Sequence, residues 1–102
     1  MSDDLKTVLD TLSLPVAYTI FDSPQNPPYI IYRLDGTDNF SADDGAYVHR
    51  SNYLIELYTD SKDETTEKSV EDALDDAGIF WNKDETYIPG EELYFVLYTV
   101  QI

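Results

Sequence analysis

Apolar residues recur with a helical period in two stretches of the chain. Both stretches place them at positions i, i+3, i+4 and i+7, which is one face of an amphipathic helix. The first set is Leu5, Val8, Leu9 and Leu12, and the second is Val70, Ala73, Leu74 and Ala77. We expect the first helix to span residues 2–13 and to end before Pro15.

The second helix has start and stop signals of its own. Ser61-Lys62-Asp63-Glu64 has the form of a capping box, so we expect Ser61 to begin this helix. Gly78 follows the last apolar position and is the residue type that most often lies just beyond a helix C-terminus.

Between and after these helices the pattern favours strands. In the longest candidate, Tyr53, Ile55 and Leu57 alternate with a mixed set that includes Glu56, so one side is apolar and the other mixed. The expected strands are residues 16–21, 29–34, 46–59, 79–88 and 92–101.

The predicted order is α-β-β-β-α-β-β in a single domain over residues 1–102. Most connections between the strands are too short for parallel crossovers. We therefore predict an α+β fold with a largely antiparallel sheet and two helices packed on one face.

The last predicted strand has no polar face. One side carries Leu93, Phe95 and Leu97, and the other carries a set from Tyr94 to Ile102. Two helices cover only one side, so either the sheet curls on itself or the second side is a subunit interface. We favour the interface, because Tyr suits surfaces that are wet when free and buried when bound. The residues assigned to it are Tyr47, Tyr53, Tyr58, Tyr94, Val96, Tyr98 and Val100.

Residues 35–45 read as a loop of small, acidic and turn residues around one aromatic side chain. The segment invites a calcium interpretation but lacks the ligand spacing of an EF-hand, so a solvated turn is the default. We expect this loop to order on assembly, with the contacts made by Asp38, Asn39, Phe40, Asp43 and Asp44.

Charge limits the classes of partner. The chain has 21 acidic and 6 basic residues and a net charge of −15. Nucleic-acid binding depends on Lys and Arg, and anionic membranes repel acidic proteins, so neither is an expected partner. A run of acids on the second helix indicates a solvated face rather than paired catalytic carboxylates. This acidic surface consists of Glu64, Glu67, Glu71, Asp72, Asp75 and Asp76.

Chemistry-bearing motifs are scarce. The sequence has no Cys and one His, His49, which has neither a second His nor a Cys with which to bind a metal. No phosphate-binding glycine pattern and no nucleophile elbow occur. We predict a protein that is not an enzyme and that has no cofactor and no metal.

Several segments together resemble a known family. They are Leu14-Pro15-Val16-Ala17-Tyr18, Pro27-Pro28-Tyr29-Ile30-Ile31-Tyr32, residues 36–43, residues 55–60, residues 78–83 and the final residues 93–98. In this order and spacing the chain resembles the tail terminator, or tail completion (tail-to-head joining), proteins of long-tailed phages and prophages of Gram-positive bacteria.

The resemblance implies a virion structural protein at the head–tail junction, present in the host cytoplasm during assembly. Such proteins form a homo-oligomeric ring, commonly a hexamer, at the head-proximal end of the tail tube. They end tube polymerisation and contact the major tail tube protein and a neck or head-completion protein. DNA passes through the lumen without specific binding during ejection. With this charge the lumen is expected to be acidic.

A second class of function stays open. An acidic phage protein can mimic DNA and inhibit a host nuclease or restriction system. Such a mimic would need charges spaced like phosphates along one face, and the densest candidate is residues 60–76.

Overall fold

The structure, a computed structural model, describes residues 2–41, 47–89 and 93–102. The described elements are α1 (Ser2–Asp10), β1 (Val16–Tyr18), β2 (Tyr29–Ser41), β3 (Tyr47–Thr59), α2 (Glu64–Asp76), β4 (Trp81–Ile88) and β5 (Leu93–Gln101). The predicted α+β class and the order α-β-β-β-α-β-β are confirmed.

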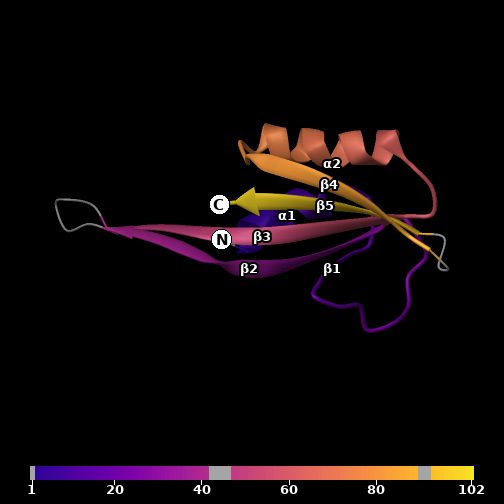
Figure 1. The fold of residues 1–102 in the computed structure, drawn as a ribbon, viewed down its shortest axis with the longest axis horizontal. Coiled ribbons are helices and arrows are strands. Elements are labelled where there is room, and N and C mark those ends of the chain that lie inside the picture. Colours follow the sequence, from indigo (N-terminus) through magenta and orange to yellow (C-terminus); the bar gives the residue numbers. More distant parts are fainter. Residues whose placement is uncertain (1, 42–46, 90–92) are drawn as a thin grey trace.

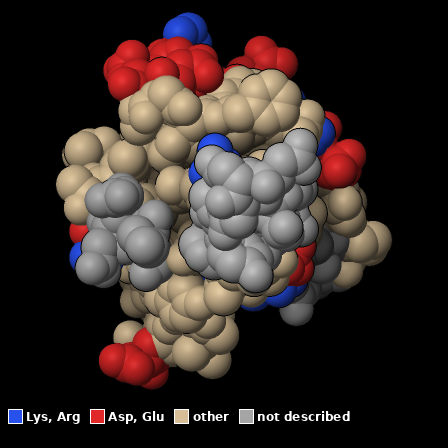
Figure 2. All heavy atoms as spheres, turned by 90° about the vertical axis from the view of Figure 1, so that its left-hand side faces the viewer, with Lys and Arg blue, Asp and Glu red and all other residues tan. Residues whose placement is uncertain are grey.

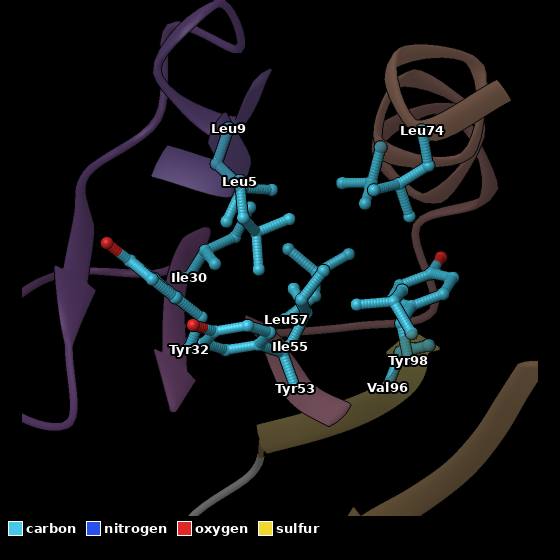
Figure 3. Close-up of a cluster of buried hydrophobic side chains, with 12 residues drawn as sticks. Leu5, Leu9, Ile30, Tyr32, Tyr53, Ile55, Leu57, Leu74, Val96 and Tyr98 are labelled. Carbon is cyan, nitrogen blue, oxygen red and sulfur yellow. The ribbon is translucent and has the colours of Figure 1, made fainter. Parts of the chain in front are cut away.

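The strands form one five-stranded sheet in the order β1-β2-β3-β5-β4. Only the short β1 runs parallel to its neighbour β2, and the other pairs are antiparallel. Figure 1 shows α2 running along the sheet beside β4 and β5. The core view in Figure 3 places α1 and α2 on the same side of the sheet.

Strand alternation determines which side chains the helices cover. Alternate residues of β2, β3 and β5 point toward α1 and α2 and are almost completely buried there (Figure 3). The buried apolar core consists of Leu5, Leu9, Ile30, Tyr32, Tyr53, Ile55, Leu57, Val70, Leu74, Val96, Tyr98 and Val100. The apolar stripes predicted for the two helices supply the helical part of this core.

The ends of α2 confirm one sequence signal and correct another. Its N-cap is Asp63, whose carboxylate accepts hydrogen bonds from the Thr66 amide at 3.0 Å and the Thr66 hydroxyl at 2.6 Å, so Ser61 lies before the helix. These bonds hold the pKa of Asp63 below its ordinary value. At the other end Gly78 has φ of +72°, and the next amide, Ile79, donates to the Leu74 carbonyl at 2.9 Å. Gly78 is therefore the expected residue beyond the C-cap.

The first helix is shorter than predicted. It ends at Asp10, and the following residues form a turn in which the Thr11 hydroxyl and amide both donate to the Val8 carbonyl. Side-chain bonding of this kind competes with continued helix. Leu12 still packs against the core from this turn.

The largest departure from the sequence prediction is a hairpin arm, which we define by its described residues, 36–41 and 47–50. Residues 35–41 were expected to form a loop, but β2 continues through them to Ser41, paired with β3. The pairing shifts register between Leu34 and Gly36, and Gly36 has φ of +112°, a conformation suited to glycine. A glycine-containing bulge lets the strand continue where turn residues suggested that it stopped.

The arm leaves the body of the sheet. Pairing between β3 and β5 begins at Asn52, and the last cross-strand backbone bonds join Ser51 to Ile102. Beyond that point β2 and β3 pair only with each other, and Figure 1 shows them extending well past the ends of β4 and β5. The arm accounts for much of the 52 Å length of the molecule, against 26 and 25 Å in the other directions.

Candidate subunit interface

Four of the seven residues predicted for the subunit interface belong to the core. Tyr53, Val96, Tyr98 and Val100 are at most 5% exposed and lie beneath the helices. They cannot meet another subunit while the fold is intact. The expected interface was therefore assigned to the wrong face of β5.

The opposite side of the sheet is the side without cover. No helix or strand among the described residues lies across it, and its apolar side chains are half-buried. We call this side the open face. By the strand registers it carries Tyr29, Ile31, Arg33, Leu54, Glu56, Tyr58, Phe95 and Leu97.

A row of aromatic rings crosses the open face. Tyr58 lies between Tyr29 and Phe95, with its ring centroid 4.9 Å from the first and 5.1 Å from the second, and both pairs are stacked. Phe21, from the segment after β1, meets the Tyr29 ring edge-on at 5.6 Å. The row extends over β2, β3 and β5, which are neighbouring strands of the sheet.

The polar groups at the centre of this face balance each other. The Arg33 guanidinium lies 3.4 Å from the Glu56 carboxylate, and the Tyr58 hydroxyl donates to the same carboxylate at 2.8 Å. These contacts orient the Tyr58 ring and leave the pair with no net charge. A largely apolar surface with a neutral polar centre is the composition found at protein interfaces.

The remaining predicted contact residues are spread over the molecule. Tyr94 lies on the helix side, half-buried, with its ring 5.1 Å from that of Tyr87. The backbone of Tyr47 starts β3 in the arm. Of the assembly-loop residues, Asp38, Asn39 and Phe40 lie in β2, while Asp43 and Asp44 lie outside the described residues.

The predicted acidic surface is only partly a surface. Glu64, Asp72, Asp75 and Asp76 are exposed, whereas Glu67 is 3% exposed and Glu71 is half-buried. The helical spacing explains the difference. Glu67 precedes Val70 by three residues and Leu74 by seven, which places it on the apolar stripe of α2.

Two lysines accompany the buried Glu67. Its Oε1 accepts hydrogen bonds from Lys62 and Lys83, each at 3.2 Å, and its Oε2 lies 2.8 Å from the Lys62 ammonium as an ion pair. That oxygen is buried and accepts no aligned hydrogen bond. The contacts raise the pKa of both lysines, that of Lys62 chiefly through Glu67 and that of Lys83 chiefly through Glu71.

Glu71 joins this network to the core. Its carboxylate accepts hydrogen bonds from the Tyr98 hydroxyl and from Lys83, both at 2.8 Å. Burial, reinforced by this negative neighbour, raises the pKa of Tyr98 far above its ordinary value. The network fixes α2 to β4 and β5.

The two sides of the sheet differ in charge. All four lysines of the chain pair with acids of the helix layer or of β4, and both arginines are on strands β2 and β3, at open-face positions of the alternation. Figure 2 shows Asp and Glu gathered where α2 lies, above a broad surface of other residues. The acids of α2 thus lie in the helix layer and not in the aromatic row.

Hollows on the described surface are shallow. One, of about 320 Å³, adjoins the aromatic row and is lined by residues that include Ile20, Phe21, Pro24 and Tyr29. Among the described residues no cluster of His, Asp or Glu could hold a metal ion. No described helix is long and apolar enough to cross a membrane.

Comparison with known proteins shows the fold. One solved chain from the virion of a native gene transfer agent (GTA) particle superposes with a TM-score of 0.58. The match covers 95% of this chain and 81% of that chain at 15% sequence identity. At this identity the similarity is one of fold. No family model matches the sequence, and no curated protein matches it.

The sequence contained a signal that would have identified the open face. Glu56 is the only charged residue in the alternating part of β3, and it lies on the side with Leu54 and Tyr58. An unpaired charge is not expected beneath two helices, so that side is the uncovered one. Phe95 and Leu97 then join it only through the β3–β5 register, which the sequence alone does not supply.

Proposed function

We propose that the protein is a structural subunit of a phage-like virion, and that it self-associates into a closed ring at the head-proximal end of the tail tube. In this role it ends tube polymerisation and joins the tail to the neck, and it has no catalytic activity. Its partners are further copies of itself, the tail tube protein and a neck protein. The ring size expected from the family resemblance is six.

The observation that carries this proposal is the uncovered aromatic face. Three stacked rings and the aliphatic Ile31, Leu54 and Leu97 occupy one side of the sheet with no described helix over them. Contiguous apolar patches of this kind on a soluble protein mark interaction sites. Because Tyr and Phe dominate the energetics of such sites, the aromatic row is the expected centre of the contact.

The shared fold supports a virion role. The GTA chain that this protein resembles is part of a virion, and the match extends over nearly the whole of the present chain. The sequence resemblance to tail terminators is independent of that structural match, and both lead to the same class of particle.

The charge distribution suggests how such a ring would interact with DNA. Exposed acids on α2 would repel a duplex that came within a Debye length of about 8 Å. We propose that the α2 layer borders the DNA path, since the open face is required for contacts between subunits. DNA would then pass without adhering.

The pairing of acids in α2 argues against the alternative of a DNA mimic. Glu67 and Glu71 are neutralised by Lys62 and Lys83, and Asp72 pairs with Lys68 at 2.8 Å. A mimic needs a row of unpaired charges spaced like phosphates. Binding to a basic nuclease, measured by pull-down, would restore that alternative.

Sedimentation velocity over a wide range of protein concentration tests self-association. The wild-type protein is expected to form a discrete ring, visible as an annulus by negative-stain electron microscopy. Phe95→Asp places a charge in the middle of the aromatic row and is expected to leave a monomer. Tyr87→Asp is the matched control, since Tyr87 is 47% exposed and pairs with Tyr94 on the helix side of the sheet.

A second measurement tests the place of the ring in the tail. Adding the wild-type protein to polymerising tail tube protein is expected to stop elongation and leave annuli at tube ends. Tubes that grow to the same lengths with and without it would rule out the terminator role. Wild-type protein that stays monomeric both alone and beside tail tubes would rule out the ring itself.

A further inference from the structure

One aromatic side chain projects from the body of the molecule. Phe80 is 75% exposed, the highest value among the large apolar side chains that the structure describes. It directly precedes β4, which is an edge strand of the sheet. The residues on either side of it, Ile79 and Trp81, both pack against the core, so the backbone that carries Phe80 is anchored. The monomer gains little from Phe80, because an apolar side chain stabilises a fold through the area that it buries.

A hollow on the other side of the sheet has the chemistry to take an aromatic ring. It is the hollow of about 320 Å³ beside the aromatic row, and its apolar lining consists of Ile20, Phe21, Pro24, Tyr29 and Ile31. The rings of Phe21 and Tyr29 meet edge-on, with centroids 5.6 Å apart. An apolar cavity of about 150 Å³ accommodates benzene, so a phenyl ring fits this hollow. Its aromatic walls favour such a ring over an aliphatic group.

Phe80 cannot enter the hollow of its own molecule. The start of β4 lies beside Val100 of β5, whereas Tyr29 in the hollow lies level with Phe95 of the same strand. The two sites therefore differ by five residues along the strands, about 17 Å at about 3.4 Å per residue. They also differ by three strand spacings across the sheet, about 14 Å at about 4.8 Å each. Contact between Phe80 and a hollow must then involve two molecules.

We propose that Phe80 of one copy inserts into the hollow of the next copy, beside the aromatic row. This inference rests on the proposed self-association and assigns two sites that meet in it. The two sites differ, so the contact is heterologous, and each copy gives a Phe80 to one neighbour and receives one from the other. Repeated contacts of that kind close into a ring when the rotation between copies allows.

The charge of the chain restricts where two copies can touch. Each copy carries a net charge of −15, so contact is favoured where acids are few. Residues 77–82, around Phe80, contain no charged residue, and residues 11–32, which include the hollow, contain only Asp22. The α2 layer, by contrast, exposes several carboxylates and would repel a second copy. The projecting ring and the hollow thus lie in the parts of the chain that suit self-contact.

The hollow is continuous with the open face. It shares Tyr29 and Ile31 with that face, and Tyr29 is also the first ring of the stacked row. A neighbour seated in the hollow therefore also reaches the aromatic row. A single contact accounts for both the projecting Phe80 and the uncovered rings.

Truncation of the projecting side chain is the first test. Phe80→Ala is expected to weaken self-association at least about tenfold, measured by sedimentation velocity over a concentration series. Because Phe80 is exposed, urea unfolding of the monomer should be nearly unchanged. Tyr87→Ala is the matched control, since it truncates another exposed aromatic side chain of β4, and it should assemble as the wild type does.

Crosslinking between copies tests which sites meet. The sequence has no Cys, so introduced thiols are the only ones. Asn82→Cys places a thiol two residues from Phe80, and Ser23→Cys places one in the lining of the hollow. At a concentration where the wild type assembles, a short bis-maleimide is expected to link an equimolar mixture of these variants into a heterodimer, identified by mass. Ser69→Cys in α2 mixed with Ser23→Cys is the control and should give only a background yield.

A chain that carries both thiols distinguishes a ring from a closed pair. With Asn82→Cys and Ser23→Cys together, crosslinking is expected to give a ladder of covalent species that ends at the ring. If the ladder stops at a covalent dimer, the copies exchange Phe80 reciprocally and the heterologous contact is wrong.

The remaining outcomes separate this inference from the proposed function. If Phe80→Ala still forms the wild-type ring, or if the two mixtures crosslink equally, Phe80 does not occupy the hollow, while self-association stands. Wild-type protein that never assembles, alone or beside tail tubes, overturns both.

Discussion

The apolar side chains on the two faces of the sheet are covered to different extents. The helix-covered face is closed within the chain by Leu5, Leu9, Val70 and Leu74, and ion pairs to the buried Glu67 secure its edge. The open face also carries apolar side chains, but no described helix covers them and they are only half-buried. The comparison indicates that one face holds the monomer together and that the other is available for assembly.

The sharpest contrast comes from two leucines of β3 that lie three residues apart. Leu57 is fully buried, so Leu57→Ala is expected to lower the free energy of unfolding by about 3 kcal/mol. Leu54 is half-buried on the open face, and Leu54→Ala should cost about 1 kcal/mol or less in the monomer. Urea denaturation measures both. Equal losses would mean that the faces do not differ in the monomer.

Disrupting the ionic network under α2 is expected to cause the next largest loss in the free energy of unfolding. Glu67→Ala leaves Lys62 and Lys83 without their shared carboxylate and is expected to cost about 2 kcal/mol, less than a fully buried pair because both lysines reach solvent. Asp72→Ala is the matched control on the same helix. It breaks the exposed pair with Lys68 and should be close to neutral. A smaller loss for Glu67→Ala than for Asp72→Ala would contradict the structural role of the network.

Removing the N-cap of α2 is expected to lower the free energy of unfolding by a smaller amount, and a nearby serine serves as the control. Asp63→Ala should cost about 1 kcal/mol, because it removes the hydrogen bonds to Thr66, whereas Ser61→Ala should be close to neutral. The depressed pKa of Asp63 means that its stabilisation is complete above the unfolded pKa of about 3.9. It is lost as the pH falls through the folded value. Thermal unfolding at neutral and acid pH measures both effects, and a larger loss for Ser61→Ala would restore the cap expected from sequence.

Alkaline pH should weaken the helix-covered face. Tyr98 has a raised pKa in the folded state, so its stabilisation is complete below the unfolded pKa of about 10 and falls as the pH rises above it. Lys62 and Lys83 act in the same direction. Unfolding free energies measured across this range should decline, and Tyr98→Phe should reduce the slope. If the slope is unchanged in that variant, groups other than Tyr98 cause the decline in unfolding free energy.

Much of this fold follows from patterns local to each element. The helical stripes, Gly78, the two-sided β3 and the element order are readable because each depends on neighbours in sequence. The sequence did not reveal which face of β5 the helices cover, because Val96 and Phe95 are equally apolar and only the pairing with β3 distinguishes them. The arm was missed for another reason. Its turn-forming residues, which include Gly36 and Asp38, are held in strand by cross-strand pairing that overrides their local preference.

The candidate site was also only partly predictable, because part of it depends on strand pairing. An uncovered face of β5 was expected, and Tyr58 was placed on the interface, but the aromatic row depends on Tyr29, Tyr58 and Phe95 meeting across three strands. Such a row needs the register of both strand pairs. The buried position of Glu67, by contrast, was available from its spacing to Val70.

The most direct test of the difference between the faces is hydroxyl-radical footprinting of the wild-type protein from dilute to concentrated solution. Oxidation of Tyr29, Tyr58 and Phe95 is expected to fall as the protein assembles, while that of Tyr87, which is 47% exposed and lies on the helix side, stays constant. Protection of Tyr87 with continued oxidation of the aromatic row would show that the copies meet elsewhere and would contradict the account.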